Sequence, residues 1–578
     1  MESSEPSFQY QPLSYHDIRI LHLSPGQPGD ELVGDLVIRN LDDKDLEYDA
    51  LSYMWGDLTP TASIHFGHQS LPIARNLMEA LQRLRYPDKT LRIWIDAICI
   101  NQNDIDERSA QVSLMRQVYR SAKTVRSWVN VSLDTSSQAI KALQSFRFTN
   151  DSDQRFGLGN DPTFWDAVAP LFNDTYWSRA WIQQEVVNAR ELVIHCVNAD
   201  FDGANVMLFQ IANEDAMQRS LTADPASMHL WREHFYNYLS PSRDLLNKRF
   251  GSHEQETLFG VLRAFCQVGM TRECDYLYAL MHLASDYHEG AIEVDYSKSR
   301  LEVVIDATEY HLRHHGDLEF LALTSAPDTL TPQGTFLRTF PTWISPRLVS
   351  PELNDRSLFS SGDCAWGRHQ SSASICKATR RLKLRGIRID HIYEFLTSGP
   401  YCSNVTVGDL VNLRSVLYCD NFIELLDKGW RTFTQTLPAQ SVADVLYYLE
   451  NIVEGTPDIP ILKDGYVNPK LCSRIEPPHV QVISPLLFLL AYGEVIQTGS
   501  RKLGIVPKCD LGVGDEVWMV LGCHLPIILR PQSDGTYWYS CATLMPEWES
   551  FEVLKDFTIS SQPGDKIGDW TVQDIEIS

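Results

Sequence analysis

The sequence lacks the features of a membrane-bound, secreted or metal-binding protein. Its longest apolar run, residues 485–492, reads as a buried helix segment because it is far shorter than the roughly 20 residues needed to span a bilayer. The polar, acidic start of the chain has no basic stretch followed by an apolar one, so we expect no secretion signal. The 12 cysteines contain no Cys-x-x-Cys pair. We therefore expect no metal and no cofactor, and reduced thiols in a cytoplasmic protein.

Positive charge is also scarce. Fifty basic residues against 75 acidic ones give a formal net charge of -25. A surface of that sign repels a phosphate backbone unless a basic patch reverses the field. The sequence shows no such run, which disfavours direct binding of nucleic acid. Hydrophobic residues make up 44% of the 578 positions, so we expect a chain that folds into several cores.

The first 200 residues contain alternating strand and helix patterns. Residues 93–100 are almost continuously apolar, which is typical of a strand buried on both faces. Asn76 is expected to cap a helix that ends near Arg85. The expected order is a hairpin at 15–45, strands at 48–55 and 64–66, a helix at 76–85, a strand at 93–100, a helix through Val112, Met115 and Tyr119, a strand at 124–129, a helix at 177–188 and a strand at 191–197. This order favours an α/β domain with a parallel sheet.

The whole chain is expected to divide into six parts. They are an N-terminal extension with short strands at 1–45, the α/β domain at 46–215, a mainly helical region at 216–323, an irregular connector at 324–380, a mixed helical region at 381–500 and a small β-rich region at 501–578. Helical patterning at 258–284 and 301–315 supports the third part. Short strands at 515–521, 526–530 and 536–540 predict a small antiparallel barrel or meander near the C-terminal end.

Four blocks of the α/β segment carry a family resemblance. They are Tyr-Asp-Ala-Leu-Ser-Tyr-Met-Trp-Gly-Asp at 48–57, the helix at 75–85, Trp-Ile-Asp-Ala-Ile-Cys-Ile-Asn-Gln at 94–102 with its continuation to 119, and Tyr-Trp-Ser-Arg-Ala-Trp-Ile-Gln-Gln-Glu at 176–185. In this order and spacing they resemble the heterokaryon incompatibility (HET) domain of filamentous fungi. Residues 275–296 and 501–530 resemble later regions of the same family. The chain departs from the family at 129–130, where the family usually has Leu-Gly.

The resemblance implies a fold and a chemistry. The HET domain is similar to TIR domains, which are flavodoxin-like α/β signalling modules, and some TIR domains cleave NAD at the nicotinamide–ribose bond through a glutamate in a Trp-x-x-x-Glu helix. Trp181 and Glu185 match this spacing, which places both side chains on one helix face. Glu185 is therefore implied as the catalytic residue, because a carboxylate can stabilise the oxocarbenium-like ribose left by nicotinamide.

A nucleotide is expected at the carboxyl ends of the parallel strands. The candidate nucleotide-binding residues are Ser52, Tyr53, Trp55, Asp57, Asn101, Gln102 and Trp181. The two tryptophans could stack on nicotinamide or adenine, or could be core aromatics. Asn101 and Gln102 could bind a ligand or satisfy the backbone of their own loop. We expect the strand through Ser52 to form one wall of a cleft that faces Glu185.

The charged candidates have structural alternatives. Glu185 could pair with Arg179 on the surface of its helix instead of acting in catalysis. Asp96 lies inside an apolar strand, where a carboxylate needs a partner. We therefore expect it to pair with an arginine such as Arg75 or Arg108.

Three functional hypotheses follow. The leading one is a fungal cytoplasmic allorecognition or cell-death signalling protein, whose HET domain acts when it assembles with itself or with another incompatibility protein. In the second, the HET domain is an NAD glycohydrolase that acts on NAD through Glu185. In the third, the chain is a catalytically inert regulatory scaffold.

Overall fold

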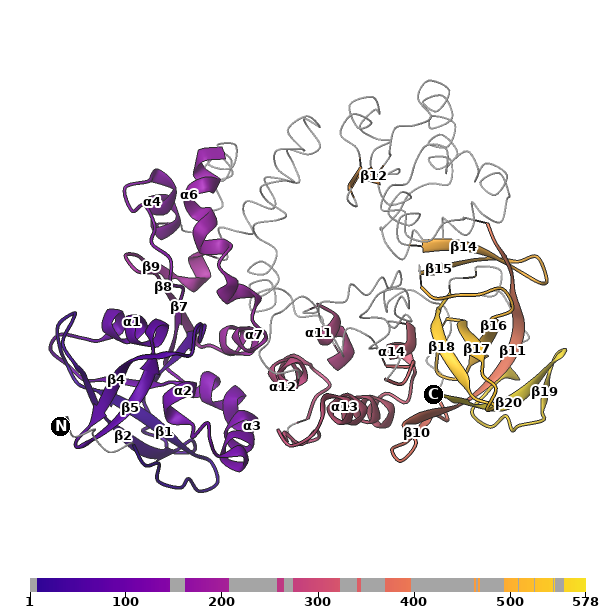
Figure 1. The fold of residues 1–578 in the computed structure, drawn as a ribbon, viewed down its shortest axis with the longest axis horizontal. Coiled ribbons are helices and arrows are strands. Elements are labelled where there is room, and N and C mark those ends of the chain that lie inside the picture. The colour runs from indigo at the N-terminus through magenta and orange to yellow at the C-terminus, as the bar shows by residue number, and fades with distance from the viewer. Residues whose placement is uncertain are drawn as a thin grey trace. The chain divides into compact units, whose positions relative to one another are not determined.

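The computed structural model describes most of the N-terminal half of the chain and much of the C-terminal strand region. The described residues are 8–145, 162–206, 257–264, 274–288, 290–322, 340–344, 370–396, 462–463, 466–467, 493–507, 509–523, 525–543, 545 and 556–578. The chain divides into two compact units, Met1–Ser299 and Arg300–Ser578 (Figure 1).

A nine-stranded mixed sheet is the framework of the first unit. Its strands are β1 (Asp17–Leu23), β2 (Leu32–Asn40), β3 (Asp49–Tyr53), β4 (Pro60–Phe66), β5 (Gln69–Ala74), β6 (Leu91–Trp94), β7 (Thr124–Trp128), β8 (Glu191–His195) and β9 (Asp200–Asp202). They lie in the order β5-β4-β2-β1-β6-β3-β7-β8-β9. The neighbours β6, β3, β7 and β8 are parallel, and β1 and β9 flank them in antiparallel pairing. The α/β class is confirmed, but the expected parallel sheet is only the centre of a mixed sheet.

The predicted N-terminal hairpin belongs to this sheet. β1 pairs with β2 along its whole length and with β6 on its other side. Arg19 of β1 is buried, and its guanidinium donates hydrogen bonds of 2.7 and 2.9 Å to the Glu107 carboxylate. Such a bidentate pair offsets the cost of removing both charges from water. The predicted boundary at 45/46 therefore falls between strands of one sheet.

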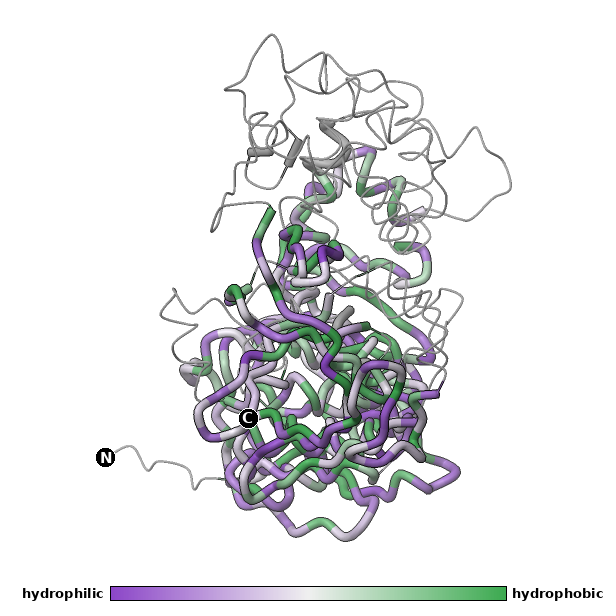
Figure 2. Tube along the Cα trace, turned by 90° about the vertical axis from the view of Figure 1, so that its right-hand side faces the viewer, coloured by the Kyte–Doolittle hydropathy of each residue, from purple (hydrophilic) through white to green (hydrophobic). Residues whose placement is uncertain are grey.

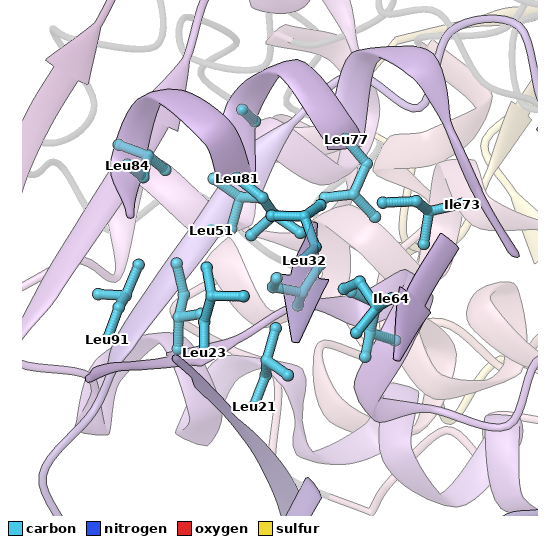
Figure 3. Packing of buried hydrophobic residues seen from close by; sticks show 14 of the residues in the cluster. Leu21, Leu23, Leu32, Leu51, Ile64, Ile73, Leu77, Leu81, Leu84 and Leu91 are labelled. Carbon is cyan, nitrogen blue, oxygen red and sulfur yellow. The ribbon is translucent and has the colours of Figure 1, made fainter. Parts of the chain in front are cut away.

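Helices pack against the strands of the first unit. They are α1 (Arg75–Leu84), α2 (Asp96–Cys99), α3 (Ile105–Ser121), α4 (Gln138–Ser145), α6 (Pro162–Phe172), η1 (Thr175–Ser178), α7 (Ala180–Val187), α11 (Leu258–Ala264), α12 (Asp275–Leu280) and η3 (Met281–Leu283). Leu77, Leu81 and Leu84 form one stripe of α1 because they recur at helical spacing. Figure 3 shows these side chains gathered with leucines and isoleucines of the strands in one buried cluster.

Two local predictions were wrong. Asn76 does not cap its helix: α1 begins one residue earlier, and the Asn76 side chain accepts from Trp128 Nε1 at 2.9 Å and donates to the Met54 carbonyl. The run at 93–100 is not one strand, because β6 ends at Trp94 and α2 follows. A helical turn lets the Asp96 carboxylate accept from the main-chain N–H of Ala97 at 2.7 Å, which a continuous buried strand would not provide.

The second unit is built around a barrel of antiparallel strands. Its elements are α13 (Arg300–His314), α14 (Glu319–Ala322), β10 (Ser374–Cys376), β11 (Arg381–Phe395), β12 (Leu462–Lys463), β13 (Tyr466–Val467), β14 (Gly493–Thr498), β15 (Leu503–Pro507), β16 (Glu516–Val520), β17 (Ile527–Pro531), β18 (Tyr537–Ala542), β19 (Lys566–Ile567) and β20 (Trp570–Ile577). β11 pairs with both β16 and β20, and the path β16-β17-β18-β20 closes the ring through one parallel residue pair between β18 and β20. The predicted β-rich character of the C-terminal region is confirmed, and its sheet also includes β11 and β14, which precede residue 501.

The region at 381–500 was predicted as mixed helical, and its first part contradicts that prediction. β11 is a 15-residue strand whose apolar side chains alternate with charged ones, and β14 adds a second strand at the end of the same region. Hydrophobic burial on one side of β11 explains the alternation. The predicted helix at 485–492 and most of the connector at 324–380 lie outside the described residues.

Hydrophilic residues interrupt the apolar ones along the described chain (Figure 2). Among the described residues, none of the helices combines the length and the hydropathy that a membrane crossing requires.

Candidate functional site

A group of polar side chains, all buried except the partly buried Asp96, lies where α7 packs against the parallel strands. We call this group the Glu185 cluster, and its members are Ser52 of β3, Asp96 of α2, Tyr119 of α3, Ser127 of β7, Tyr176 of η1 and Glu185 of α7. Each member comes from a different element, so the fold alone brings them together. Ser52 and Ser127 are register partners in neighbouring parallel strands.

Glu185 is the centre of the cluster and has only 4% of its surface exposed. The hydroxyls of Ser52 and Tyr119 lower the pKa of its carboxyl group, and its Oε2 atom has no hydrogen-bond partner among the described residues. Burial, and then the nearby Asp96 carboxylate, raise the pKa of Glu185 to about 8. Removing a charge from water, close to a like charge, favours the neutral acid. Most of Glu185 is therefore protonated at neutral pH.

Three hydroxyl groups of the Glu185 cluster form a chain of hydrogen bonds. Ser52 Oγ lies 2.7 Å from Tyr176 Oη, and Tyr176 Oη donates to Ser127 Oγ at 2.7 Å. Tyr119 Oη donates to the main-chain carbonyl of Leu51 at 3.0 Å. Both serines are fully buried, so each hydroxyl needs these partners.

Asp96 is held by neutral donors rather than by an arginine. Trp55 Nε1 donates to its Oδ2 at 2.8 Å, and the Ala97 main-chain N–H donates to Oδ1. Burial raises the pKa of Asp96, while the bond from Trp55 opposes that change. We expected Asp96 to pair with an arginine, but its partners are the Trp55 indole and the main-chain N–H of Ala97.

The two arginines expected beside Asp96 lie elsewhere, so that prediction was wrong. Arg75 is exposed on α1 and pairs with Glu79 at 2.8 Å. Arg108 is buried, and its guanidinium lies over the ring of Tyr296 at 4.4 Å. Sequence spacing alone does not determine which way an arginine on a helix turns.

Arg179 precedes α7 and donates to the main-chain carbonyl of Tyr53 at 3.3 Å. Its positive charge lowers the pKa of Glu185, but less strongly than burial raises it. Arg179 therefore acts on Glu185 through space. The expected surface ion pair between the two is not observed, because Glu185 faces inward.

The structure brings together only part of the predicted nucleotide-binding group. Ser52, Tyr53 and Trp55 lie close to the Glu185 cluster, and Gln102 donates its amide to the main-chain carbonyl of Asp96 at 2.9 Å. Asp57 is exposed and accepts hydrogen bonds from Thr59, which lower the pKa of Asp57.

Asn101 and Trp181 are both partly buried. The Asn101 side chain accepts a hydrogen bond from the main-chain N–H of Asn103 at 3.3 Å, and the main-chain N–H of Asn101 donates to the Glu107 carboxylate at 2.7 Å. Asn101 and Gln102 thus satisfy the loop that follows α2. The expected open cleft is not what surrounds Glu185, because that carboxyl group is buried.

Sequence reasoning missed Tyr119, Ser127 and Tyr176 as members of a polar network. The tyrosines were interpreted through family pattern and helix face, and the serine through its strand. A signal was present: each of two buried strands carries a serine among apolar residues, at Ser52 and Ser127, and a buried hydroxyl requires a partner. Within the described ranges no group of three or more His, Cys, Asp or Glu side chains could hold a metal ion.

Comparisons with known proteins place this site inside a recognised domain. Residues 48–185 match the family described as heterokaryon incompatibility protein (HET). The chain is also 38% identical over 109 residues to heterokaryon incompatibility protein 6, OR allele, of Neurospora crassa. That alignment covers 17% of this chain and 16% of the relative, so it spans about a sixth of the relative's length. No solved structure matches the chain.

Proposed function

We propose that this chain, whose residues 48–185 match the HET family, acts in fungal allorecognition as a cytoplasmic cell-death signalling protein. The observation that carries the proposal is the extent of the family match. It begins at Tyr48, immediately before β3, and ends at Glu185. All members of the Glu185 cluster therefore lie within it, although they come from separate elements. The relative's name supports a role in incompatibility.

Self-association, or assembly with another incompatibility protein, would supply the signal. The proposal is tested by regulated overexpression of the full chain in a filamentous fungus. We expect growth arrest or cell death that tracks the protein level. Glu31→Gln is the matched control for the Glu185→Gln variant described below, because it makes the same chemical change at an exposed residue outside the family match. Normal growth at high levels of intact protein would contradict the proposal.

A second candidate function is NAD glycohydrolase activity through Glu185. The observation that favours it is a pair of neighbouring carboxyl groups, the buried Glu185 and the partly buried Asp96, each with a raised pKa. Perturbed carboxyl groups of this kind are common where acid–base chemistry occurs. An ionised Glu185 would stabilise the oxocarbenium-like ribose when neutral nicotinamide leaves. In the folded state Glu185 is buried, so the reaction requires a rearrangement that admits NAD.

Glu185→Gln separates the two functions. Glutamine has the shape of the neutral acid, so a signalling domain that acts by assembly alone should still kill cells. An enzyme should lose nicotinamide release and toxicity together, because an amide cannot carry the negative charge. The measurement is nicotinamide release by the purified full chain, before and after concentration-driven assembly. Toxicity that survives in the glutamine variant would leave assembly, or a scaffold role, as the function.

A further inference from the structure

Residues 8–11 bind to the edge of the sheet in the first unit, and we call them the N-terminal strap. The main-chain N–H of Phe8 donates to the carbonyl of Ser70 in the edge strand β5 at 3.1 Å. The Phe8 ring lies 4.7 Å from the ring of Phe66 in β4. All four residues of the strap are exposed or partly buried. A surface segment of this kind can detach without opening a hydrophobic core.

The other end of the strap holds the end of α2. Tyr10 Oη donates to the main-chain carbonyl of Ile98 at 3.0 Å. Arg19 of β1 donates to the main-chain carbonyl of Cys99 at 2.9 Å. The Arg19 guanidinium also lies over the Tyr10 ring at 4.8 Å and donates to the carbonyl of Gln11. Because the last carbonyl groups of a helix have no partner within it, Tyr10 and Arg19 supply the hydrogen bonds that α2 lacks.

α2 depends on contacts of this kind because it has only four residues, Asp96–Cys99. A helix this short is not stable by itself in water. Its first residue is Asp96, and the Asp96 carboxylate accepts a hydrogen bond from Trp55 Nε1 at 2.8 Å. The position of α2 therefore decides whether the hydrogen bond between Trp55 and Asp96 forms.

We propose that the N-terminal strap is a regulatory contact that holds α2 in place. While Tyr10 donates to Ile98, α2 keeps Asp96 bonded to Trp55, and detachment of the strap releases that bond. Tyr10 is a positioning residue in this device, because it acts on Asp96 through α2. The strap lies before residue 48, where the family match begins, so the matched domain is controlled from outside the match.

The consequence for activity rests on the proposed NAD glycohydrolase function, whereas the hold on α2 does not. Glu185 is buried in the folded state, so a glycohydrolase needs a rearrangement that admits NAD. α2 carries Asp96, a member of the Glu185 cluster, and its C-terminal end is held in part by a surface segment. Release of the strap would free α2 to move and so favour that rearrangement.

The test compares the full chain with Tyr10→Phe, which keeps the ring and removes the hydroxyl that holds Ile98. Hydrogen exchange is measured on peptides that cover residues 94–102, and the indole N–H signal of Trp55 is followed by NMR. Loss of one ordinary hydrogen bond corresponds to roughly twofold to tenfold faster exchange. We expect that acceleration at 94–102 and at the Trp55 indole. Tyr15→Phe is the matched control, because it removes the same hydroxyl from a side chain that is 85% exposed.

Phe8→Ala tests whether the strap acts as one body. Phe8 is anchored on β4 and β5, yet its replacement should also speed exchange at residues 94–102, because it loosens the strap. In a Tyr10→Phe background, Phe8→Ala should add less than about twofold there, since the strap no longer bonds to α2. Equal effects of Phe8→Ala in both backgrounds would overturn the proposal. Unchanged exchange at 94–102 after Tyr10→Phe, or equal acceleration in α2, β3 and β7, would also overturn it.

Nicotinamide release and toxicity are measured in parallel. Both should rise by about twofold or more in Tyr10→Phe, whereas a residue that only stabilises the fold would lower both when it is replaced. Lower activity together with a released α2 would therefore overturn the regulatory role. Local release without activity in either protein would refute the glycohydrolase function and leave the hold on α2 standing. Higher activity without local release would give the reverse.

Discussion

Replacing Glu185 with glutamine should change how the stability of the first unit depends on pH. The folded protein raises the pKa of Glu185 from 4.5 to about 8. Between these values the folded chain holds a proton that the unfolded chain has released. The contribution of Glu185 to stability is therefore complete below about pH 4.5 and is lost as the pH rises through about 8. Glutamine keeps the shape of the neutral acid but does not titrate.

The expected size follows from the two pKa values, which differ by about 3.5. One pKa unit corresponds to about 1.36 kcal/mol, so the whole effect is of the order of 5 kcal/mol. Between about pH 5.5 and about pH 7.5 the wild type should lose roughly 2–3 kcal/mol relative to Glu185→Gln. Other titrating groups are common to both proteins and cancel in the difference.

The measurement is urea unfolding of both full-length proteins at several pH values, followed by hydrogen exchange of peptides that cover β3 and β7. A local probe is needed because the two units need not unfold together. Parallel pH dependences in the two proteins would refute the reasoning. Such a result would mean that Glu185 ionises near its ordinary pKa in the folded protein.

Two further substitutions test the packing of each unit. Glu107→Gln leaves the buried Arg19 guanidinium without its carboxylate and should lower the free energy of unfolding of the first unit by about 2–4 kcal/mol; an unchanged thermal transition would show that Arg19 finds another partner. Arg530 holds the Asp515 carboxylate with two hydrogen bonds of 2.8 Å, and lysine cannot reproduce this bidentate pairing. Arg530→Lys should therefore cost about 1–2 kcal/mol in the barrel, seen as faster hydrogen exchange in β16 to β18 and not in β3.

Much of the fold could be predicted because its signals are local. The apolar strands β3, β7 and β8 and the leucine stripe of α1 repeat with the periods of strand and helix. The short C-terminal strands β16 to β18 were also predicted from the sequence. β11 was missed because its segment was included in the region predicted as mixed helical, although its apolar and charged residues alternate. The alternation of apolar and charged residues in β11 could therefore have been used to predict the strand.

Other features required the tertiary structure. No local pattern shows that β1 pairs with β6, since pairing between distant strands depends on the packing of the whole sheet. The partner of Asp96 is Trp55 rather than an arginine, because the turn into α2 and the orientation of the indole place a neutral donor there. The sequence gives the positions of the arginines, but it does not show which residue each arginine side chain contacts.

The sequence by itself determined the resemblance of residues 48–185 to the HET family, the α/β class and the position of Glu185 in a Trp-x-x-x-Glu helix. Only the tertiary structure decided the protonation state of Glu185. Its charge depends on burial, on the Asp96 carboxylate and on the Ser52, Arg179 and Tyr119 side chains that lower its pKa. These are properties of groups contributed by separate elements, and the free energy of a buried carboxyl group depends on the neighbours that folding supplies.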